Sequence, residues 1–434
     1  MSTVSYTKTL PVRGHWDVII AGGGPAGIGA AVAAAEKGAK TLVIERGCFL
    51  GGMATAGFVN PMSEFCYNGE WVTGGIPRRF GEALVREGAG FWEMPRGNLS
   101  FDPERYKLVA QRMVLAAGAE IALETELVDC LMDGERISGL VIHDRTGLGV
   151  LEVDVYIDAT GDAVLAALAG VPMLPDSRPA QPASLCWRMA NVDTTTERMH
   201  IIHLNKHGVN HQAVFVRETL FALREAGERV PLFGGPWLCT TLQEGCITIN
   251  MSRSAVDATD AADYAKKVRE LTEDVYTLAD LLIRHVPEFK NAYVSAVAPS
   301  LGIRQSRRIR GLYTLTGRDY LDGVQFKDSV ARACHPVDIH LPGDEGQKLT
   351  FPLEAAYIPY RTMCPERVPN LLAAGRCVSA DEDAFAAIRV QAPCMELGQA
   401  AGFAAAMAVQ AGCAVQDVDR NALVYAVRRA GSFV

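Results

Sequence analysis

The chain has 434 residues, of which 49% are hydrophobic and 21% charged, and its formal net charge at pH 7 is −8. This length suits two or three structural units with a large buried core, and the negative charge excludes a general attraction to nucleic acid or to an anionic membrane. The apolar run at 400–409 is too short to span a bilayer, so we expect no membrane insertion.

Eleven cysteines are scattered along the chain without a C-x-x-C pair or a histidine-spaced cluster. This pattern indicates reduced thiols rather than disulfides or zinc, so we expect no metal. The N-terminus lacks a basic segment followed by an apolar core, and we therefore expect a cytoplasmic protein. Cys48 has no second thiol nearby, which favours a small apolar filler over a redox partner.

A strand, a glycine turn, a helix and a second strand follow one another near the N-terminus. The apolar run at 17–21 predicts a strand buried on both faces. The sequence Gly-Gly-Gly-Pro-Ala-Gly at 22–27 opens an alanine-rich helix that ends near Lys37, and a second strand at 41–44 ends in Glu45. All these elements in register predict a dinucleotide site rather than a merely tight turn.

The glycines of this turn have the G-x-G-x-x-G spacing. Gly22 allows the tight turn, Gly24 lets the backbone approach a pyrophosphate, and Gly27 lets the helix pack closely on the strand. Pro25 and Ala26 begin the helix, whose N-terminus offers free N–H groups and partial positive charge to phosphates. The acid at the end of the second strand would accept hydrogen bonds from an adenosine ribose.

A loop of small residues continues from Arg46 to Gly57 and includes Gly52 and Met53. Such a loop allows the backbone to lie against a flat or bulky ligand, and the alternative is a flexible surface loop. We favour the ligand, because the neighbouring glycine turn already predicts one.

Helices are predicted at 77–87 and, with Asp102 as N-cap, at 103–117. Three strand-like runs with hairpin signals between them predict a three-stranded β-meander; they cover 121–130, 137–143 and 150–159. Thr160, Gly161 and Asp162 then form a turn at the end of the third run. A turn in this position can contact a ligand that lies over a parallel sheet.

Prolines crowd the segment 172–182 and mark a boundary. Short strands are predicted at 184–190 and 246–252. A long amphipathic helix is predicted from Thr259, as N-cap, to about His285, and we interpret its apolar stripe as core rather than as a groove.

Four arginines follow within seven residues, at 304, 307, 308 and 310. They predict either a solvated charged strand with interdomain ion pairs or an anion clamp, since guanidinium groups bind carboxylates bidentately. His335, Asp338 and His340 lie close together soon after. As metal ligands they lack a convincing further partner. His340 is either a structural residue or an acid or base.

The last third of the chain repeats the first pattern. A buried strand at 370–374 leads into Gly375 and Arg376, and a helix rich in small residues follows at about 392–411. A glycine turn between a strand and a closely packed helix suits a second approach to the same cofactor.

These motifs occur in the same order in one group of proteins. They are the turn at 22–27 with Glu45-Arg46, Gly51-Gly52-Met53, Asp158 to Ala163, Ser306 to Ile309, Pro336 to His340 and Ala374 to Cys377. The chain resembles the FAD-dependent oxidoreductase family of glutathione-reductase-like flavoproteins over nearly its whole length. The resemblance implies an α/β fold with a Rossmann-like FAD-binding domain, a parallel sheet, the meander and an inserted α+β substrate domain.

The implied boundaries are 1–175 and 351–434 for the FAD-binding domain and 176–350 for the substrate or cap domain. The resemblance also implies an extended FAD. From adenine to flavin its expected contacts are Val128, Glu45, Gly22, Gly24 and the turn to Gly27, Gly161 with Asp162, and Gly375 with Arg376. One departure is Asp381-Glu382, where relatives often have Thr-His; an acidic pair would change the chemistry if that histidine served the flavin or substrate.

Our working hypothesis is hydride transfer between a small organic substrate and flavin N5. Arg308, or Arg307, would hold an oxyanion or carboxylate, and His340 would move the proton. The alternatives are a flavin monooxygenase, or an FAD-binding electron-transfer subunit that needs a partner. No second complete dinucleotide fingerprint is apparent, which argues against a built-in NAD(P)H site. The expected partners are a small-molecule substrate and an unknown electron donor or acceptor, and a homo-oligomer is one option.

Overall fold

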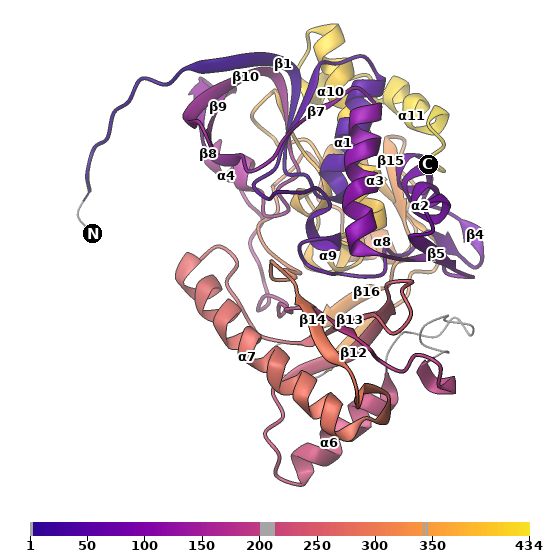
Figure 1. The fold of residues 1–434 in the computed structure, drawn as a ribbon. Helices are drawn as coiled ribbons and strands as arrows, with labels where there is room; N and C mark the ends of the chain where they lie inside the picture. Colours follow the sequence, from indigo (N-terminus) through magenta and orange to yellow (C-terminus); the bar gives the residue numbers. More distant parts are fainter. Residues whose placement is uncertain (1–2, 200–212, 342, 344–345) are drawn as a thin grey trace.

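The computed structural model describes residues 3–199, 213–341, 343 and 346–434. Two lobes are visible in Figure 1. The first lobe combines the N-terminal and C-terminal parts of the chain, whereas the second lobe comes from the middle of the chain. The fold is α/β with a mixed, mainly parallel sheet in the first lobe.

The sheet of the first lobe has seven strands. Their order is β7 (Glu120–Ala122), β2 (Thr41–Ile44), β1 (Val12–Ala21), β10 (Gly147–Asp158), β9 (Arg136–Asp144) and β8 (Glu126–Asp133), and β19 (Leu371–Ala373) also pairs with β10. The strands β7, β2, β1, β10 and β19 are parallel, and β8, β9 and β10 pair in antiparallel fashion. Val18, Ile19 and Ile20 are fully buried because helices and loops cover both faces of β1.

The run predicted as one strand at 121–130 forms two strands in different places. The chain breaks between β7 and β8, where Glu124 adopts a positive φ of 49° and the Thr125 hydroxyl donates to the Leu123 carbonyl. β7 therefore pairs with the parallel edge, whereas β8 pairs with β9.

The helices α1 (Pro25–Glu36) and α10 (Gln391–Ala411) pack together on the sheet, and α3 (Pro103–Ala116) lies beside α1 (Figure 1). Glycines allow the close approach: a Cβ on Gly398 would lie 1.9 Å from the Ala26 carbonyl oxygen, and one on Gly402 2.2 Å from that of Ala30. Asp102 caps α3 as predicted, accepting from the Glu104 N–H. The other segments of the first lobe are α2 (Gly75–Arg86), α4 (Val164–Leu168), α11 (Arg420–Arg429), β3 (Cys66–Tyr67), β4 (Glu70–Trp71), β5 (Gly90–Glu93) and β6 (Asn98–Phe101).

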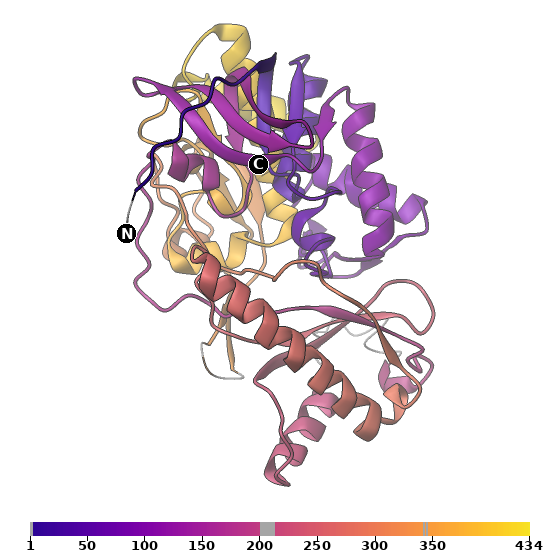
Figure 2. The same ribbon diagram turned by 60° about the vertical axis from the view of Figure 1, so that its left-hand side comes forward.

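The second lobe is a four-stranded antiparallel sheet with helices against it. The strand order is β12 (Phe233–Thr240), β13 (Ile247–Ser252), β11 (Trp187–Ala190) and β14 (Tyr293–Val297), and the helices are α6 (Val214–Glu225) and α7 (Ala261–His285). Figure 2 shows α7 lying across this lobe. Its stripe is core, as predicted, because Leu271 and Val275 are fully buried. The N-cap is Asp260 rather than Thr259, whose hydroxyl instead donates to Asp257.

The core of the second lobe ends near Ile303, well before the predicted boundary at 350. Leu315, Val330 and Val337 instead pack into the first core. The elements of the first lobe that follow residue 303 include β15 (Ser329–Ala333), β16 (Val337–His340), β17 (Gln347–Thr350), β18 (Ala356–Pro359), α8 (Gly317–Leu321) and α9 (Glu382–Ile388). Among the helices of the described residues, none combines the length and apolarity needed to cross a membrane.

Candidate functional site

A cavity of about 950 Å³ lies between the two lobes. This volume is at the upper end of the range for ligand and cofactor sites, roughly 300–1,000 Å³. All three glycine turns reach it, through Gly24, Gly161 and Gly375. The other predicted cofactor residues in its wall are Gly22, Pro25, Ala26, Glu45, Arg46, Gly52, Met53, Thr160, Asp162 and Arg376.

The three glycines of the first turn differ in the space that surrounds them. A Cβ on Gly22, at φ +104°, would lie 2.5 Å from the Ala159 carbonyl oxygen, and one on Gly27 would lie 1.9 Å from that of Gly22. A Cβ on Gly24 would meet nothing closer than the Cα of Gly52, at 3.9 Å. Gly22 and Gly27 therefore satisfy internal packing, whereas Gly24 faces the open cavity at the N-terminus of α1. This cradle fits a pyrophosphate.

Glu45 is held in place at the end of β2. Its Oε2 accepts from the Gly23 N–H and its Oε1 from the Gly47 N–H, both at 2.7 Å. A carboxylate has about four acceptor positions, so the two oxygens retain lone pairs for ligand hydroxyl groups. A ribose fits this arrangement.

The second and third turns contact each other through Arg376. A Cβ on Gly161 would lie 2.5 Å from Nη2 of Arg376, and that nitrogen lies 3.6 Å from Oδ1 of Asp162. The Nε of Arg376 is buried and has no hydrogen-bond partner among the described residues. An orphaned donor in a cavity wall fits a ligand that brings acceptors. Below it, the buried Asp158 fixes the turn by accepting from Thr160 N–H and Ala166 N–H.

Val128 does not line the cavity, contrary to prediction. The pairing register between β8 and β9 shifts from Leu127 to Asp129, which leaves Val128 in a bulge with 45% of its surface exposed. Glu126, on the same strand, lines the cavity instead.

Arg307 and Arg308 also lie outside the cavity wall. Nη1 of Arg308 donates to the Ala380 carbonyl at 2.9 Å, its Nη2 pairs with Asp176, and its side chain is 1% exposed. Nε of Arg307 donates to the Asp162 carbonyl at 3.0 Å. Backbone hydrogen bonds tie this end of the arginine segment to residues 172–174, which turns it away from the cavity. These two guanidiniums bind protein groups rather than an open site.

His340 does line the cavity, but neither ring nitrogen is free. Its Nδ1 lies 2.8 Å from Nη2 of Arg253 and its Nε2 lies 3.1 Å from Oδ2 of Asp338. Because guanidinium only donates, Nδ1 accepts and the proton is on Nε2. Burial and the charge of Arg304 lower the pKa of His340 to about 3, against the opposing effect of Asp338. The ring is therefore neutral at pH 7.

Two other arginines line the cavity, Arg304 and Arg389, and neither was among the arginines predicted to hold the substrate. Arg304 belongs to the arginine-rich segment, so composition was a partial signal for it. Arg389 is at the end of α9, and nothing local distinguishes it. Glu64 is a third such residue: it is 7% exposed, and burial raises its pKa, although His335 and Arg96 oppose the shift.

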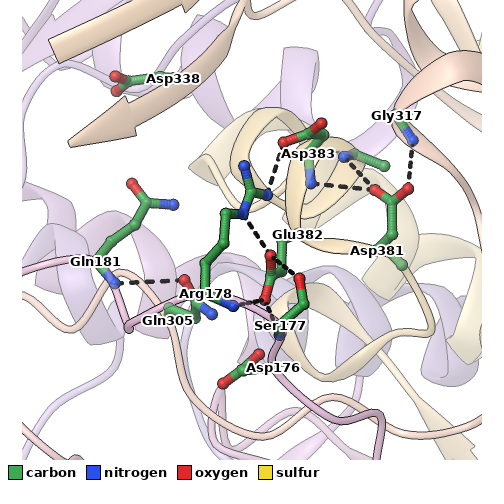
Figure 3. A network of polar contacts seen from close by, with 12 residues as sticks. Asp176, Ser177, Arg178, Gln181, Gln305, Gly317, Asp338, Asp381, Glu382 and Asp383 are labelled. Atoms are coloured by element: carbon green, nitrogen blue, oxygen red, sulfur yellow. Dashed lines mark hydrogen bonds and ion pairs between the residues drawn. The ribbon is translucent and has the colours of Figure 1, made fainter. Parts of the chain in front are cut away.

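The acidic pair Asp381-Glu382 makes structural contacts (Figure 3). Asp381 caps α9 and accepts from the Gly317 N–H at 2.8 Å. Glu382 accepts from Ser177 Oγ at 2.9 Å and from Arg178, so it fastens the segment leading to the second lobe. Burial opposes its ionisation, but the bonds from Arg178 and Ser177 prevail and lower the pKa of Glu382 to about 2. Neither residue lines the cavity.

Cys48 is exposed and lines the cavity together with Glu45, so its interpretation as a small apolar filler is wrong. All eleven cysteines are unpaired thiols, as expected. Within the described ranges, no three His, Cys, Asp or Glu side chains are grouped as metal ligands.

Comparison with known families identifies the cofactor. A family model described as FAD dependent oxidoreductase matches residues 17–428. The chain belongs to the FAD dependent oxidoreductase family. It is accordingly an enzyme and a flavoprotein, and its cofactor is FAD. The cradle at Gly24, the fixed carboxylate of Glu45 and the orphaned donor of Arg376 are all consistent with this cofactor.

Individual curated proteins match only part of the chain. A thiamine thiazole synthase from Aeropyrum pernix is 31% identical over 173 residues, which are 34% of this chain and 56% of that protein. A digeranylgeranylglycerophospholipid reductase from Picrophilus torridus is 27% identical over 196 residues, 42% of this chain and 48% of that protein. The chain thus spans about half the length of these curated relatives.

Solved structures with a similar course of the chain include a geranylgeranyl bacteriochlorophyll reductase-like protein from Thermoplasma acidophilum. It is 14% identical, with a TM-score of 0.46, and the match covers 96% of this chain and 82% of that one. An aromatic hydroxylase from angucycline biosynthesis is 12% identical, with a TM-score of 0.49 and coverage of 96% and 68%.

Proposed function

We propose that the chain is a dehydrogenase or reductase that transfers a hydride between a small organic substrate and N5 of its flavin. The observation that carries the proposal is the convergence of three glycine turns on one cavity that extends to the second lobe. The first turn, with Glu45, is suited to the adenosine and pyrophosphate. Asp162, Gly375 and Arg376 are suited to the part of FAD that follows.

The substrate would lie between the flavin and the second lobe. Trp237, Cys239 and Asn250, from β12 and β13, line the cavity from that side. Bound FAD supplies the hydride acceptor or donor. We therefore assign the role of a substrate domain to the second lobe, whose core lies mainly between Ala183 and Ile303, rather than to all of 176–350. The second lobe would orient the substrate and exclude water.

Proton transfer is better assigned to Glu64 than to His340. Both nitrogens of His340 are engaged by protein groups, whereas Glu64 lines the cavity as a buried carboxyl group. Burial raises the pKa of Glu64, which makes its protonated form easier to reach than that of an exposed glutamate. Arg96, whose Nη2 lies 3.1 Å from Oε1 of Glu64, fixes its position.

The test is an anaerobic screen with the purified, FAD-loaded protein. Hydroxy acids, cyclic ketones, amines and sugars are added singly while the visible absorbance of the flavin is followed. Bleaching by one class, without oxygen, supports hydride transfer. Substrate-dependent oxygen consumption with oxygen incorporation, and no anaerobic bleaching, would instead favour a monooxygenase. A folded protein that is colourless and does not bind added FAD would overturn the assignment altogether.

A further inference from the structure

We infer that Arg304 and Arg389 form a subsite for a carboxylate group carried by the substrate, which rests on the proposed function and narrows its substrate class. Both side chains line the cavity. Arg304 follows the last strand of the second lobe, whereas Arg389 ends α9 in the first lobe. The two cations therefore approach the cavity from opposite sides of the boundary between the lobes.

Arg304 is oriented entirely by neutral groups. Its Nη1 donates to the Pro182 carbonyl at 2.7 Å and to Ser184 Oγ at 2.9 Å, and its Nη2 lies 3.4 Å from Oδ1 of Asn250. Among the described residues, no carboxylate comes within ion-pair distance of this guanidinium. The neutral acceptors fix its direction, and the carboxylate whose charge acts on it, Asp338, is shared with Arg389.

Arg389 is nearly buried, with 9% of its side chain exposed. Its Nη2 donates to the Asp338 carbonyl at 3.0 Å and to Gln181 Oε1 at 3.3 Å. The same nitrogen is 3.8 Å from Oδ2 of Asp338, which is a long contact for an ion pair. Burial lowers the pKa of Arg389 to about 10, so the group still carries its charge at neutral pH.

Asp338 cannot balance both arginines. Its Oδ2 already accepts from Nε2 of His340 at 3.1 Å, and its Oδ1 accepts from Gln347 Nε2 at 2.5 Å. The neutral His340 adds no compensating negative charge. Two guanidiniums and one shared carboxylate leave this part of the wall with an excess positive charge. Because an unbalanced buried cation is costly, an anionic ligand group is the natural partner.

The pyrophosphate of FAD does not account for this charge. Its cradle is formed by Gly24 and the N-terminus of α1, on the opposite lobe from the Ser184 and Asn250 groups that hold Arg304. The FAD region also has its own arginine, since Arg376 lies against Gly161. Planar guanidinium groups match a carboxylate bidentately, which favours carboxylic acids over neutral ketones, amines or sugars.

The experiment titrates the FAD-loaded enzyme with acetate, succinate and benzoate and, as matched neutral probes, with acetamide, succinamide and benzamide. Binding is followed by the change in the visible flavin spectrum and, independently of the flavin, by the thermal unfolding midpoint from circular dichroism. We expect at least one acid to bind at least tenfold more tightly than its amide. Arg304→Gln and Arg389→Gln should weaken that acid at least tenfold and leave amide binding unchanged.

Arg310→Gln is the matched control, because this exposed arginine of the same segment lies outside the cavity wall, and it should bind acids like the parent enzyme. If Arg304→Gln does not fold, Arg304→Lys keeps the charge, loses the planar fork and should weaken binding less. Equal affinity for acids and amides, or unchanged acid binding in Arg304→Gln and Arg389→Gln, would overturn the subsite. The FAD content of each preparation is measured first, so a failure to bind FAD counts against the proposed function alone.

Discussion

Nη2 of Arg253 lies 2.8 Å from Nδ1 of His340, and this contact decides what the histidine can do. The ring is neutral and donates its only proton to Asp338. We therefore expect His340→Gln to slow flavin reduction by less than about tenfold and to keep the shape of its pH profile between pH 5 and 8. Stopped-flow measurement of anaerobic flavin reduction tests this. A hundredfold loss, together with the disappearance of an ionisation near pH 6.5, would return the proton transfer to His340.

Glu64→Gln should have the larger effect in the same assay. The amide keeps the size of the side chain but cannot exchange a proton, so we expect flavin reduction to slow by about a hundredfold or more. One ionisation should also disappear from the pH profile, while FAD content stays unchanged. A Gln variant with the parent rate at every pH would remove Glu64 from the mechanism.

Two glycines of the first turn should respond differently to the same added methyl group. Gly24→Ala has room for its Cβ within the protein, so we expect a folded variant whose affinity for FAD falls at least tenfold. Gly27→Ala would place its Cβ 1.9 Å from a carbonyl oxygen, so it should lower the free energy of unfolding by about 3 kcal/mol or more. Urea unfolding of the apoprotein and FAD titration distinguish the two. A destabilised Gly24→Ala with normal FAD affinity would contradict the assignment of the cradle.

Cys48 should report on occupancy of the adenosine end. Its exposed thiol lines the cavity close to Glu45, so bound FAD should slow its alkylation by iodoacetamide at least tenfold. The partly exposed Cys246 and Cys413 lie outside the cavity wall, and FAD should not change their labelling. Mass spectrometry after timed labelling measures all three. Equal labelling of Cys48 with and without FAD would place the adenosine elsewhere.

Glu396 makes stability depend on pH. It is fully buried in α10, and burial raises its pKa from 4.5 to about 7, although the Arg332 N–H donates to it at 3.0 Å. Between these values the folded state binds more protons than the unfolded state, so stability falls as pH rises through this range. Glu396→Gln should remove the loss and gain about 2 kcal/mol relative to the parent protein between pH 5 and 8. Urea unfolding at both pH values measures this change, and Glu135→Gln, at a 68% exposed side chain, should show no comparable gain.

The elements that the sequence predicts correctly depend on neighbouring residues. The glycine spacing, the cap at Asp102 and the apolar stripe of α7 each depend on residues that are close in the sequence, so a short stretch of sequence is enough to predict them. Residue preferences alone did not decide between Thr259 and Asp260 as the N-cap of α7, because both residue types cap helices well. In the structure Asp260 is the N-cap, and the Thr259 hydroxyl donates to Asp257.

The residues that the sequence wrongly assigned to the site are positioned by partners that are distant in the sequence. Arg308 is fixed by Asp176 and by the Ala380 carbonyl, and nothing near Arg308 in the sequence reveals either contact. Val128 leaves the cavity because of a bulge, whose position depends on pairing with β9. Arg389 joins Arg304 only because the two lobes meet there. Substrate-side chemistry was therefore the part least accessible from the sequence.

The close packing of α1 on α10 has a consequence for biosynthesis. The oxygen of Ala26 touches the backbone of Gly398, so the first helix of the protein needs one of the last helices to cover it. While the ribosome is still translating the middle of the chain, the alanine-rich face of α1 has no partner. Stable capture of the coenzyme must then wait until α10 has left the exit tunnel, and a nascent chain that stalls earlier would present that face to chaperones.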